Sequence, residues 1–456
     1  MSSIARLIAP FILAVVVSVP SHAQSLRDAV AQAVATNPLI GEAAANRRAI
    51  EQEIDQARGL YRPRLDLQAF TGPQKINRPE SLGDNNWTWR NASQASLTAS
   101  QRLFDGYFRA FELYRQHARV SGAAFRVLER SEVVALDAIE AYVDLLRHRR
   151  TLHLANVNIE QHRDIAARIA DLAAEGTSTE GDVQQARERL AGAEAIRSDI
   201  IQAIGEVEAR YKRVIGHAPG SLQKVGNPKS LPRSKEAAVA IARSNHPSLK
   251  ALDSDIESAE AEVGQTQSLF LPKIDLEGTA LIGKNLGGTP GRNDEVSARV
   301  ALSWNLFDGG IRNAQKRETI ERKTEVEIRR DRVRRDIDEA AERSFSDVHA
   351  NNIRVRALNE QLRQAELVRG SYREEFDAGL RSLLDILDAQ ATVFNAQVQV
   401  TSAQSIGVFS RYQLIASTGR LLERFGINAP RESEIGVPAS TFRPAGGFSL
   451  EPLRKW

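Results

Sequence analysis

The sequence of 456 residues contains no cysteine and a single methionine, and only 6% of its residues are aromatic. The absence of cysteine excludes disulfide bonds, thiolate metal sites and cysteine nucleophiles. It also excludes the acylated N-terminal cysteine that a bacterial lipoprotein needs. Ala, Arg, Glu, Gln and Leu fill long stretches instead, and this composition favours long helices over one thick core.

An excess of charge of one sign is also lacking. The chain has 61 Lys and Arg against 58 Asp and Glu, spread along its length. The densest basic run, Arg329 to Arg335, contains Asp331 and is followed by acidic residues, so a solvated helix face is favoured over a phosphate-binding patch. The eight histidines include no close pair with metal-ligand spacing, and no Gly-rich phosphate loop follows a strand. We therefore expect no nucleic-acid partner, no metal site, no cofactor and no enzymatic activity.

Long apolar runs are confined to the N-terminus. Arg6 precedes a mostly apolar run over Leu7 to Val19, and Ser21-His22-Ala23 offers small residues at the two cleavage-determining positions. This pattern predicts a signal peptide over residues 1–23; a retained membrane helix is the alternative, but the run is short for one. No later segment approaches 18 consecutive apolar residues, so any crossing of a membrane by the mature chain must be made by strands.

The chain does contain an internal repeat of about 200 residues. Two blocks match at an offset of 209 residues, and the blocks after them match at 203. Such a repeat predicts a duplicated unit whose copies are structural equivalents, and the gap of six residues should lie in an exposed loop. The matched motifs are Asn37-Pro38 with His246-Pro247, Tyr61-Arg62-Pro63 with Phe270-Leu271-Pro272, and Leu103-Phe104-Asp105-Gly106 with Leu306-Phe307-Asp308-Gly309.

Each half predicts the same succession of elements. A helix is followed by two segments of alternating apolar and polar residues, which predict a β-hairpin of strands of about ten residues. A very long helical stretch follows, broken once at a Gly-containing tip, and its heptad-like spacing favours antiparallel supercoiled packing. The predicted units are a first repeat over 24–216 (β-hairpin 63–104, helical hairpin 107–215), a connector over 217–234, a second repeat over 235–425 (β-hairpin 272–307, helical hairpin 311–422) and a partly disordered tail over 426–456.

The predicted strands have the length and the two-sided pattern of transmembrane β-strands, although a soluble amphipathic hairpin would look similar. Four strands cannot close a membrane barrel with a usable lumen, and every strand edge in lipid must be paired. Several copies must therefore share one barrel. Three copies would supply twelve strands, whereas two would supply eight and leave a lumen mostly filled by side chains, so we favour the trimer.

The duplicated Pro-containing strand starts, the Leu-Phe-Asp-Gly exits and the tip sequence from Leu383 to Gln390 resemble the TolC outer-membrane channel family, most closely its type I secretion members. The resemblance covers about Leu26 to Gly426. It implies a mixed membrane protein with a trimeric 12-stranded β-barrel, four strands coming from each chain, and a long antiparallel α-helical coiled-coil barrel. The location implied is the outer membrane of a Gram-negative bacterium, with partners in a periplasmic adaptor and an inner-membrane ABC or proton-driven transporter.

Two carboxylates are candidate gate residues. Asp385 and Asp388 are three residues apart, one turn past the second hairpin tip, and so share one helix face. Three copies would place six carboxylates around one axis, and the resemblance implies that they line the narrow periplasmic entrance. Such a ring would select cations. An ordinary solvated acidic face is the alternative.

The resemblance also implies a latch for the closed state. Asp182, at the first tip, matches a family position that pairs with an arginine at the position of Arg381. Phe376 stands where relatives often have a hydrogen-bonding tyrosine, a bond that phenylalanine cannot make. We expect opening to move the second tip outward, and replacement of Asp182 and Arg381 by alanine to raise channel conductance.

Tryptophans lie near both ends of the predicted strands. Trp304, near the base of the fourth strand, is expected on the apolar face as an anchor at the membrane interface. Trp87 and Trp89, expected in the first hairpin loop, could have the same role or pack within the loop.

The sequence thus predicts an outer membrane exit duct for protein or small-molecule cargo, in type I secretion, multidrug efflux or both. The alternative is a periplasmic coiled-coil adaptor or scaffold of an export complex, since adaptors also contain helical hairpins. Adaptors normally carry one such hairpin and additional β-rich domains, whereas here the hairpin is duplicated.

Overall fold

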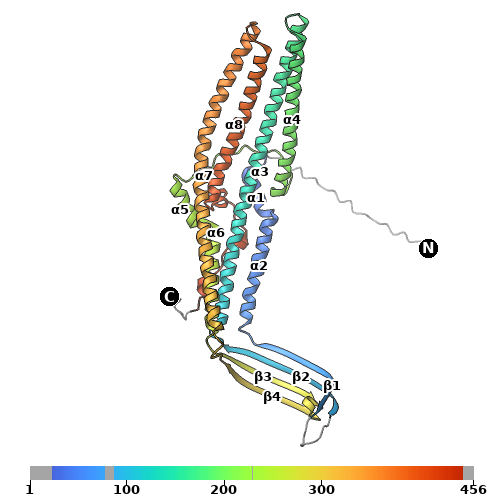
Figure 1. Cartoon of the computed structure of the whole chain (residues 1–456), viewed down its shortest axis with the longest axis vertical. Coiled ribbons are helices and arrows are strands. Elements are labelled where there is room, and N and C mark those ends of the chain that lie inside the picture. The colour runs from blue at the N-terminus through green and yellow to red at the C-terminus, as the bar shows by residue number, and fades with distance from the viewer. Residues whose placement is uncertain (1–22, 78–86, 229, 445–456) are drawn as a thin grey trace, which may run out of the picture.

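The structure of the chain is a computed structural model that describes residues 23–77, 87–228 and 230–444. Apart from Ala23, the predicted signal peptide lies outside these residues. The molecule is elongated, with long helices running side by side and a β-sheet at one end (Figure 1). The helices labelled α1 (Leu26–Thr36) and α5 (Lys235–Asn245) lie at mid-height along the long helices.

Each half begins with two helices separated by proline. In the first half, α1 (Leu26–Thr36) begins after Ser25, whose hydroxyl accepts a hydrogen bond from the Asp28 amide, and α2 (Pro38–Gly59) begins after Asn37. In the second half, α5 (Lys235–Asn245) and α6 (Pro247–Ser268) are divided at His246. Proline is favourable at a first helical position because its missing N–H would be unsatisfied there. The repeat of the Pro motif is therefore a repeat of helix starts.

The long helices form two hairpins. The first consists of α3 (Phe108–Ala174) and α4 (Glu180–Ile215), and the second of α7 (Ile311–Asp377) and α8 (Leu383–Ser417). Their bounds agree closely with the helical stretches expected from the sequence. The second hairpin is followed by a short α9 (Leu421–Phe425) after a break at Gly419, whose φ of +69° ends α8. Every helix in the described ranges is too short or too polar to cross a lipid bilayer.

The four strands form one antiparallel sheet in the order β1 (Arg64–Asn77), β2 (Trp87–Phe104), β3 (Lys273–Lys284) and β4 (Arg292–Ser303). The expectation of strands of about ten residues was wrong for the first half, where β1 has 14 residues and β2 has 18. β1 continues through Gly72 and Pro73, two residue types that usually interrupt a strand. Within one chain β1 is an edge strand, and proline is tolerated on such a strand where its nitrogen points away from the paired neighbour.

The register places apolar residues of all four strands on one face. Leu67 lies opposite Leu97, Leu97 opposite Ala280, and Ala280 opposite Val296. The next row on the other face is polar, with Asp66, Thr98, Thr279 and Ser297 in line. The apolar side chains are uncovered in the single chain: Leu67 is 72% exposed and Val296 is 89% exposed. A sheet with one exposed apolar face and one polar face is suited to lie between an apolar and an aqueous environment.

The sheet is joined to the long helices by a device that occurs twice. Asp105 accepts hydrogen bonds from the backbone N–H and from Nε of Arg109, the latter at 2.7 Å. Asp308 accepts the same two bonds from Arg312, again at 2.7 Å to Nε. The Arg109 guanidinium lies 4.7 Å from the centre of the Tyr61 ring and that of Arg312 lies 5.2 Å from the centre of the Phe270 ring. The repeated Phe-Asp-Gly motif is thus a strand-to-helix turn clamped by an arginine.

The largest core cluster lies at mid-height and brings the two ends of the described chain together. Val30 of α1, Tyr142 of α3, Tyr211 of α4 and Leu421 of α9 are all buried in it. The hydroxyl of Tyr142 donates to the Gln24 carbonyl oxygen at 2.6 Å. Neither half of the chain forms this core alone.

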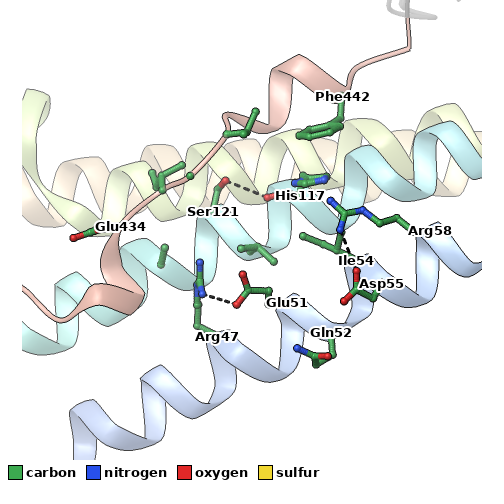
Figure 2. Close-up of a pocket in the computed structure, with 15 residues that line it drawn as sticks. Arg47, Glu51, Gln52, Ile54, Asp55, Arg58, His117, Ser121, Glu434 and Phe442 are labelled. Carbon is green, nitrogen blue, oxygen red and sulfur yellow. Dashed lines mark hydrogen bonds and ion pairs between the residues drawn. The ribbon is translucent and has the colours of Figure 1, made fainter.

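The described part of the C-terminal tail is folded against the helices. Phe442 stacks on His117 of α3 with ring centroids 3.5 Å apart, and Ala439 is buried beside it. Figure 2 shows the cavity of about 400 Å³ that lies between this segment, α2 and α3. Within that cavity, Arg47 pairs with Glu51 at 2.6 Å. Residues 445–456 lie outside the described residues, so disorder of the tail remains a prediction.

Candidate gate at the helical tips

The two helical tips are built by the same local bonds. At the first tip, the Asp182 carboxylate accepts from the Thr179 hydroxyl at 2.7 Å and from the Thr179 amide at 3.0 Å. At the second tip, the Asp385 carboxylate accepts from the Ser382 hydroxyl at 2.8 Å and from the Ser382 amide at 3.2 Å. Both are capping boxes, which satisfy amides at a helix start. The hydrogen bond from the capping hydroxyl lowers the pKa of each carboxyl from its usual value.

Of the two predicted gate carboxylates, only Asp388 reaches the other hairpin. Its Oδ1 atom lies 3.4 Å from Nη2 of Arg189 on α4, and its side chain is 60% exposed. Asp385 is held by its own capping box, so its carboxylate has a local structural role in each chain. Arg189 was not found by sequence reasoning, because nothing in the sequence links positions 199 residues apart.

The structure does not bring Asp182 and Arg381 together within one chain. Arg381 donates to Glu375 at 2.6 Å, across the turn of its own tip. Its guanidinium also lies 4.2 Å from the centre of the Tyr372 ring. A latch made by Asp182 and Arg381 therefore stays a prediction that would need contact between different chains.

Phe376 lies between the two hairpins. It packs against an apolar cluster that includes Ile169 and Val183 of the first hairpin and Leu387 of the second. Without a hydroxyl it contributes only contact area here.

Two further links join the hairpins near the tips, and sequence reasoning missed both. Arg168 of α3 pairs with Asp377 of α7 at 2.6 Å. Deeper in the bundle, Nε2 of Gln390 donates to Oδ1 of Asn158 at 2.9 Å, and both side chains are buried. The position of Gln390 in an otherwise apolar heptad seam was a detectable indication, because a buried amide needs a partner. The partner itself could not be identified from the sequence.

Trp304 lies at one end of the sheet, and Trp87 and Trp89 lie at the other. Trp304 directly follows β4, is 53% exposed, and donates from Nε1 to the Phe270 carbonyl oxygen at 3.1 Å. The placement of Trp87 and Trp89 in a loop was wrong: they lie in β2, opposite Asn77 and Lys75 of β1. They alternate in phase with Leu97 and so belong to the apolar face. The Lys75 ammonium lies 5.7 Å from the centre of the Trp87 ring and 5.9 Å from the centre of the Trp89 ring.

Comparison with known proteins identifies relatives of the whole chain. It is 26% identical over 430 residues to outer membrane efflux protein BepC of Brucella suis, covering 92% of this chain and 89% of BepC. It is 23% identical over 424 residues to outer membrane protein TolC of Escherichia coli, covering 89% of this chain and 84% of TolC. The CmeC outer membrane channel of Campylobacter jejuni shares the fold, with a TM-score of 0.76 at 16% identity, over 90% of this chain and 89% of CmeC.

The family model described as outer membrane efflux protein matches the chain twice, over residues 29–215 and 238–420. The two matched segments fall within the two repeats predicted over 24–216 and 235–425. The resemblance to TolC-like channels is therefore confirmed, as is a location in the outer membrane of Gram-negative bacteria with extension into the periplasm. The chain belongs to the outer membrane efflux protein family.

Proposed function

We propose that this protein is the outer membrane exit duct of a tripartite export system. It would carry protein or small-molecule cargo outward, as part of type I secretion, multidrug efflux or both. Its partners would be a periplasmic adaptor and an inner-membrane ABC or proton-driven transporter. Membership of the efflux family supports this proposal, and the observation that carries it is the continuous apolar face of the four-stranded sheet.

The sheet supports assembly into a homotrimer. Strands β1 and β4 are its edges, and within the described residues neither has a strand on its outer side. Unpaired backbone groups are too costly to leave in lipid, so the edges must pair with those of other copies. Three chains would supply twelve strands, with the apolar face toward outer membrane lipid and the polar face lining the lumen.

The layer of long helices also has an uncovered helix at each side. Over most of their length, the long helices contact one another in the order α4, α3, α8 and α7, and α4 meets α8 only to a small extent, near the tips. This order leaves α4 and α7 at the two ends of the layer. Ile196 on α4 and Ile353 on α7 are exposed there, so joining the ends of neighbouring copies would cover apolar surface and close a tube.

Site-directed spin labels would test the barrel. Labels at Leu67, Leu276 and Val300 should report contact with acyl chains in reconstituted vesicles. Labels at Thr98, Thr279 and Ser297 occupy the polar face and should report water. Equal accessibility of both sets would contradict the barrel, and a purified particle holding one copy of the chain would contradict the trimer.

Within this duct, we propose that Asp385 and Asp388 form the periplasmic gate ring, with six carboxylates in the trimer. Such a ring would select cations at the narrow entrance. The latch would include Arg189 with Asp388 and Arg168 with Asp377, because these ion pairs tie the second hairpin to the first. Asp182, Arg381 and Phe376 would contribute through contacts between copies or by packing.

The adaptor or scaffold alternative has less support. The family match covers both repeats and is to outer membrane efflux proteins. The two functions make different predictions in cell fractionation: a heat-resistant oligomer in the outer membrane supports the duct, whereas a soluble periplasmic monomer would support the scaffold.

A further inference from the structure

A cavity of about 580 Å³ lies between α7 and α8, next to the connector that joins the two repeats. Volumes of about 300–1,000 Å³ are typical of small-molecule sites. The polar side chains of its lining are His349, Asn352 and Arg356 from α7, Gln404 and Arg411 from α8, and Asn227 from the connector.

The helical period explains why these side chains meet. His349, Asn352 and Arg356 are spaced by three and four residues, and so are Gln404, Val408 and Arg411, so each set lies along one face of its helix. The connector is held close by a bond from the Tyr412 hydroxyl to the Gly226 carbonyl oxygen at 3.3 Å. Three separate segments thus converge on one cavity.

The charge of the lining is unusual for this protein. Both arginines are cationic, three side chains are amides, and no carboxylate lines the cavity. Four other cavities in the described part of the chain each include at least one Asp or Glu. In the cavity beside the tail, for example, Arg47 and Arg58 pair with Glu51 and Asp55 (Figure 2). The arginines of the α7–α8 cavity lack this neutralisation.

The two arginines differ in how they are held. Arg411 donates to the Gly407 carbonyl oxygen and to Oδ1 of Asn352, each at 2.5 Å, which fixes its guanidinium at the cavity wall. Arg356 and His349 make no hydrogen bond or ion pair with any other described residue. The guanidinium of Arg411 is therefore held in place before a ligand binds, whereas Arg356 and His349 are free to contact the ligand.

We propose that the α7–α8 cavity is a binding site for an oxyanion, either a phosphate or a carboxylate. Guanidinium groups bind both in bidentate fashion, and a cleft lined by one sign of charge concentrates ions of the other sign. Amide groups from Asn227, Asn352 and Gln404 would bind the polar remainder of such a ligand. Binding of the anion does not rest on the export function; only the exclusion of lipid headgroups uses the proposed position of the sheet in the membrane.

The position of the cavity excludes lipid headgroups as the source of the anion. Arg356 lies 45 residues beyond the start of α7 at Ile311, which at 1.5 Å per residue is about 70 Å from the sheet. The source would therefore be a soluble anion, and titration of free ions is the appropriate test.

Isothermal titration calorimetry of the detergent-purified full chain would test the site. Inorganic phosphate and citrate should each give saturable heat at one site per chain, and sodium chloride at equal ionic strength should not. The ratio of the two affinities would identify which oxyanion the site prefers. Arg356→Gln should weaken binding by about tenfold or more, the loss expected for a hydrogen bond between charged groups.

Arg354→Gln is the matched control, because Arg354 is an exposed arginine two residues away on α7 that does not line the cavity. It should leave binding unchanged. Equal losses in both variants, or no loss in Arg356→Gln, would overturn the proposal. The absence of phosphate and citrate binding would overturn it as well. If Arg356→Glu then also dissociated the oligomer, the cavity would instead hold a carboxylate of a neighbouring copy.

Discussion

Nη2 of Arg189 on α4 lies 3.4 Å from Oδ1 of Asp388 on α8, so one of the two predicted gate carboxylates is paired with the opposite helical hairpin. Both side chains are more than a third exposed, and such pairs typically contribute only about 0–1 kcal/mol. A contact this weak is suited to a closed state that must be released, because modest differential binding by a partner can offset it.

Removal of the ion pairs between hairpins should open the channel. We expect the double variant Arg168→Ala, Arg189→Ala to raise single-channel conductance in planar bilayers, because it weakens the closed state by roughly 0.5–2 kcal/mol. The matched control is Arg197→Ala, since Arg197 bonds Asn156 within its own hairpin. Unchanged conductance in the double variant would remove these pairs from the latch.

The capping boxes should make the tips sensitive to acid. Ser382→Ala should loosen the start of α8 at a cost of about 1 kcal/mol, detected as faster hydrogen exchange of the amides after Ser382. The hydrogen bond from the Ser382 hydroxyl lowers the pKa of the Asp385 carboxyl in the folded protein. The cap therefore stabilises the tip above the unfolded pKa of about 4, and this stabilisation is lost as the pH falls through the pKa of Asp385 in the folded protein. Thr179→Ala should affect the first tip alone, and exchange that changes at both tips would argue against independent caps.

A buried carboxylate should make the mid-height core sensitive to pH in the opposite direction. Glu132 of α3 accepts hydrogen bonds from the amides of Leu421 and Leu422, at 2.8 and 3.1 Å. Burial raises its pKa to about 7. The stability that protonated Glu132 contributes is therefore fully present below the unfolded pKa of about 4.5 and is lost as the pH rises through 7. The free energy of unfolding should change by on the order of 3 kcal/mol over this range.

Glu132→Gln should accordingly flatten the dependence of Tm on pH between 5 and 8, measured by circular dichroism. The comparison is with the parent protein, whose Tm should contain a component that falls over this range. A parallel pH dependence in the two proteins would show that Glu132 does not titrate there.

Two equivalent glycines should differ in their tolerance of alanine. Gly106 and Gly309 have nearly the same φ, +68° and +69°. A Cβ at Gly106 would lie 2.7 Å from the Ser268 carbonyl oxygen, whereas at Gly309 it would meet no atom within 4 Å. Gly309→Ala should cost only the strain of a left-handed residue, about 1–2 kcal/mol. Gly106→Ala should cost clearly more, seen as a lower Tm or a smaller yield of folded oligomer, and equal costs would contradict the close packing seen at Gly106.

The sequence was most informative where both repeats carry the same local pattern. The Pro motifs, the Phe-Asp-Gly turns and the two helical tips each depend on bonds among residues close in the chain, so their structure could be predicted. The extent of β1 could not, because Pro73 is acceptable only once β1 is known to be an edge strand. The fold of the tail could not be predicted either, since Phe442 is anchored by His117, more than 300 residues earlier.

The candidate gate was predictable only in part for the same reason. The positions of Asp385 and Asp388 on one helix face follow from their spacing. Their partners depend on how two hairpins pack, and no local pattern in the sequence indicates that Arg189 approaches Asp388 or that Arg168 approaches Asp377. The family resemblance indicated a different pair, which the chain does not form by itself.

The shared burial of Val30 and Leu421 has a consequence for how the protein matures in the cell. Residues of α1 cannot complete their packing until those of α9, about 390 residues later in the chain, have been exported as well. A nascent chain would therefore remain incompletely folded throughout its translocation, and truncation anywhere before α9 would leave both halves without a finished interior.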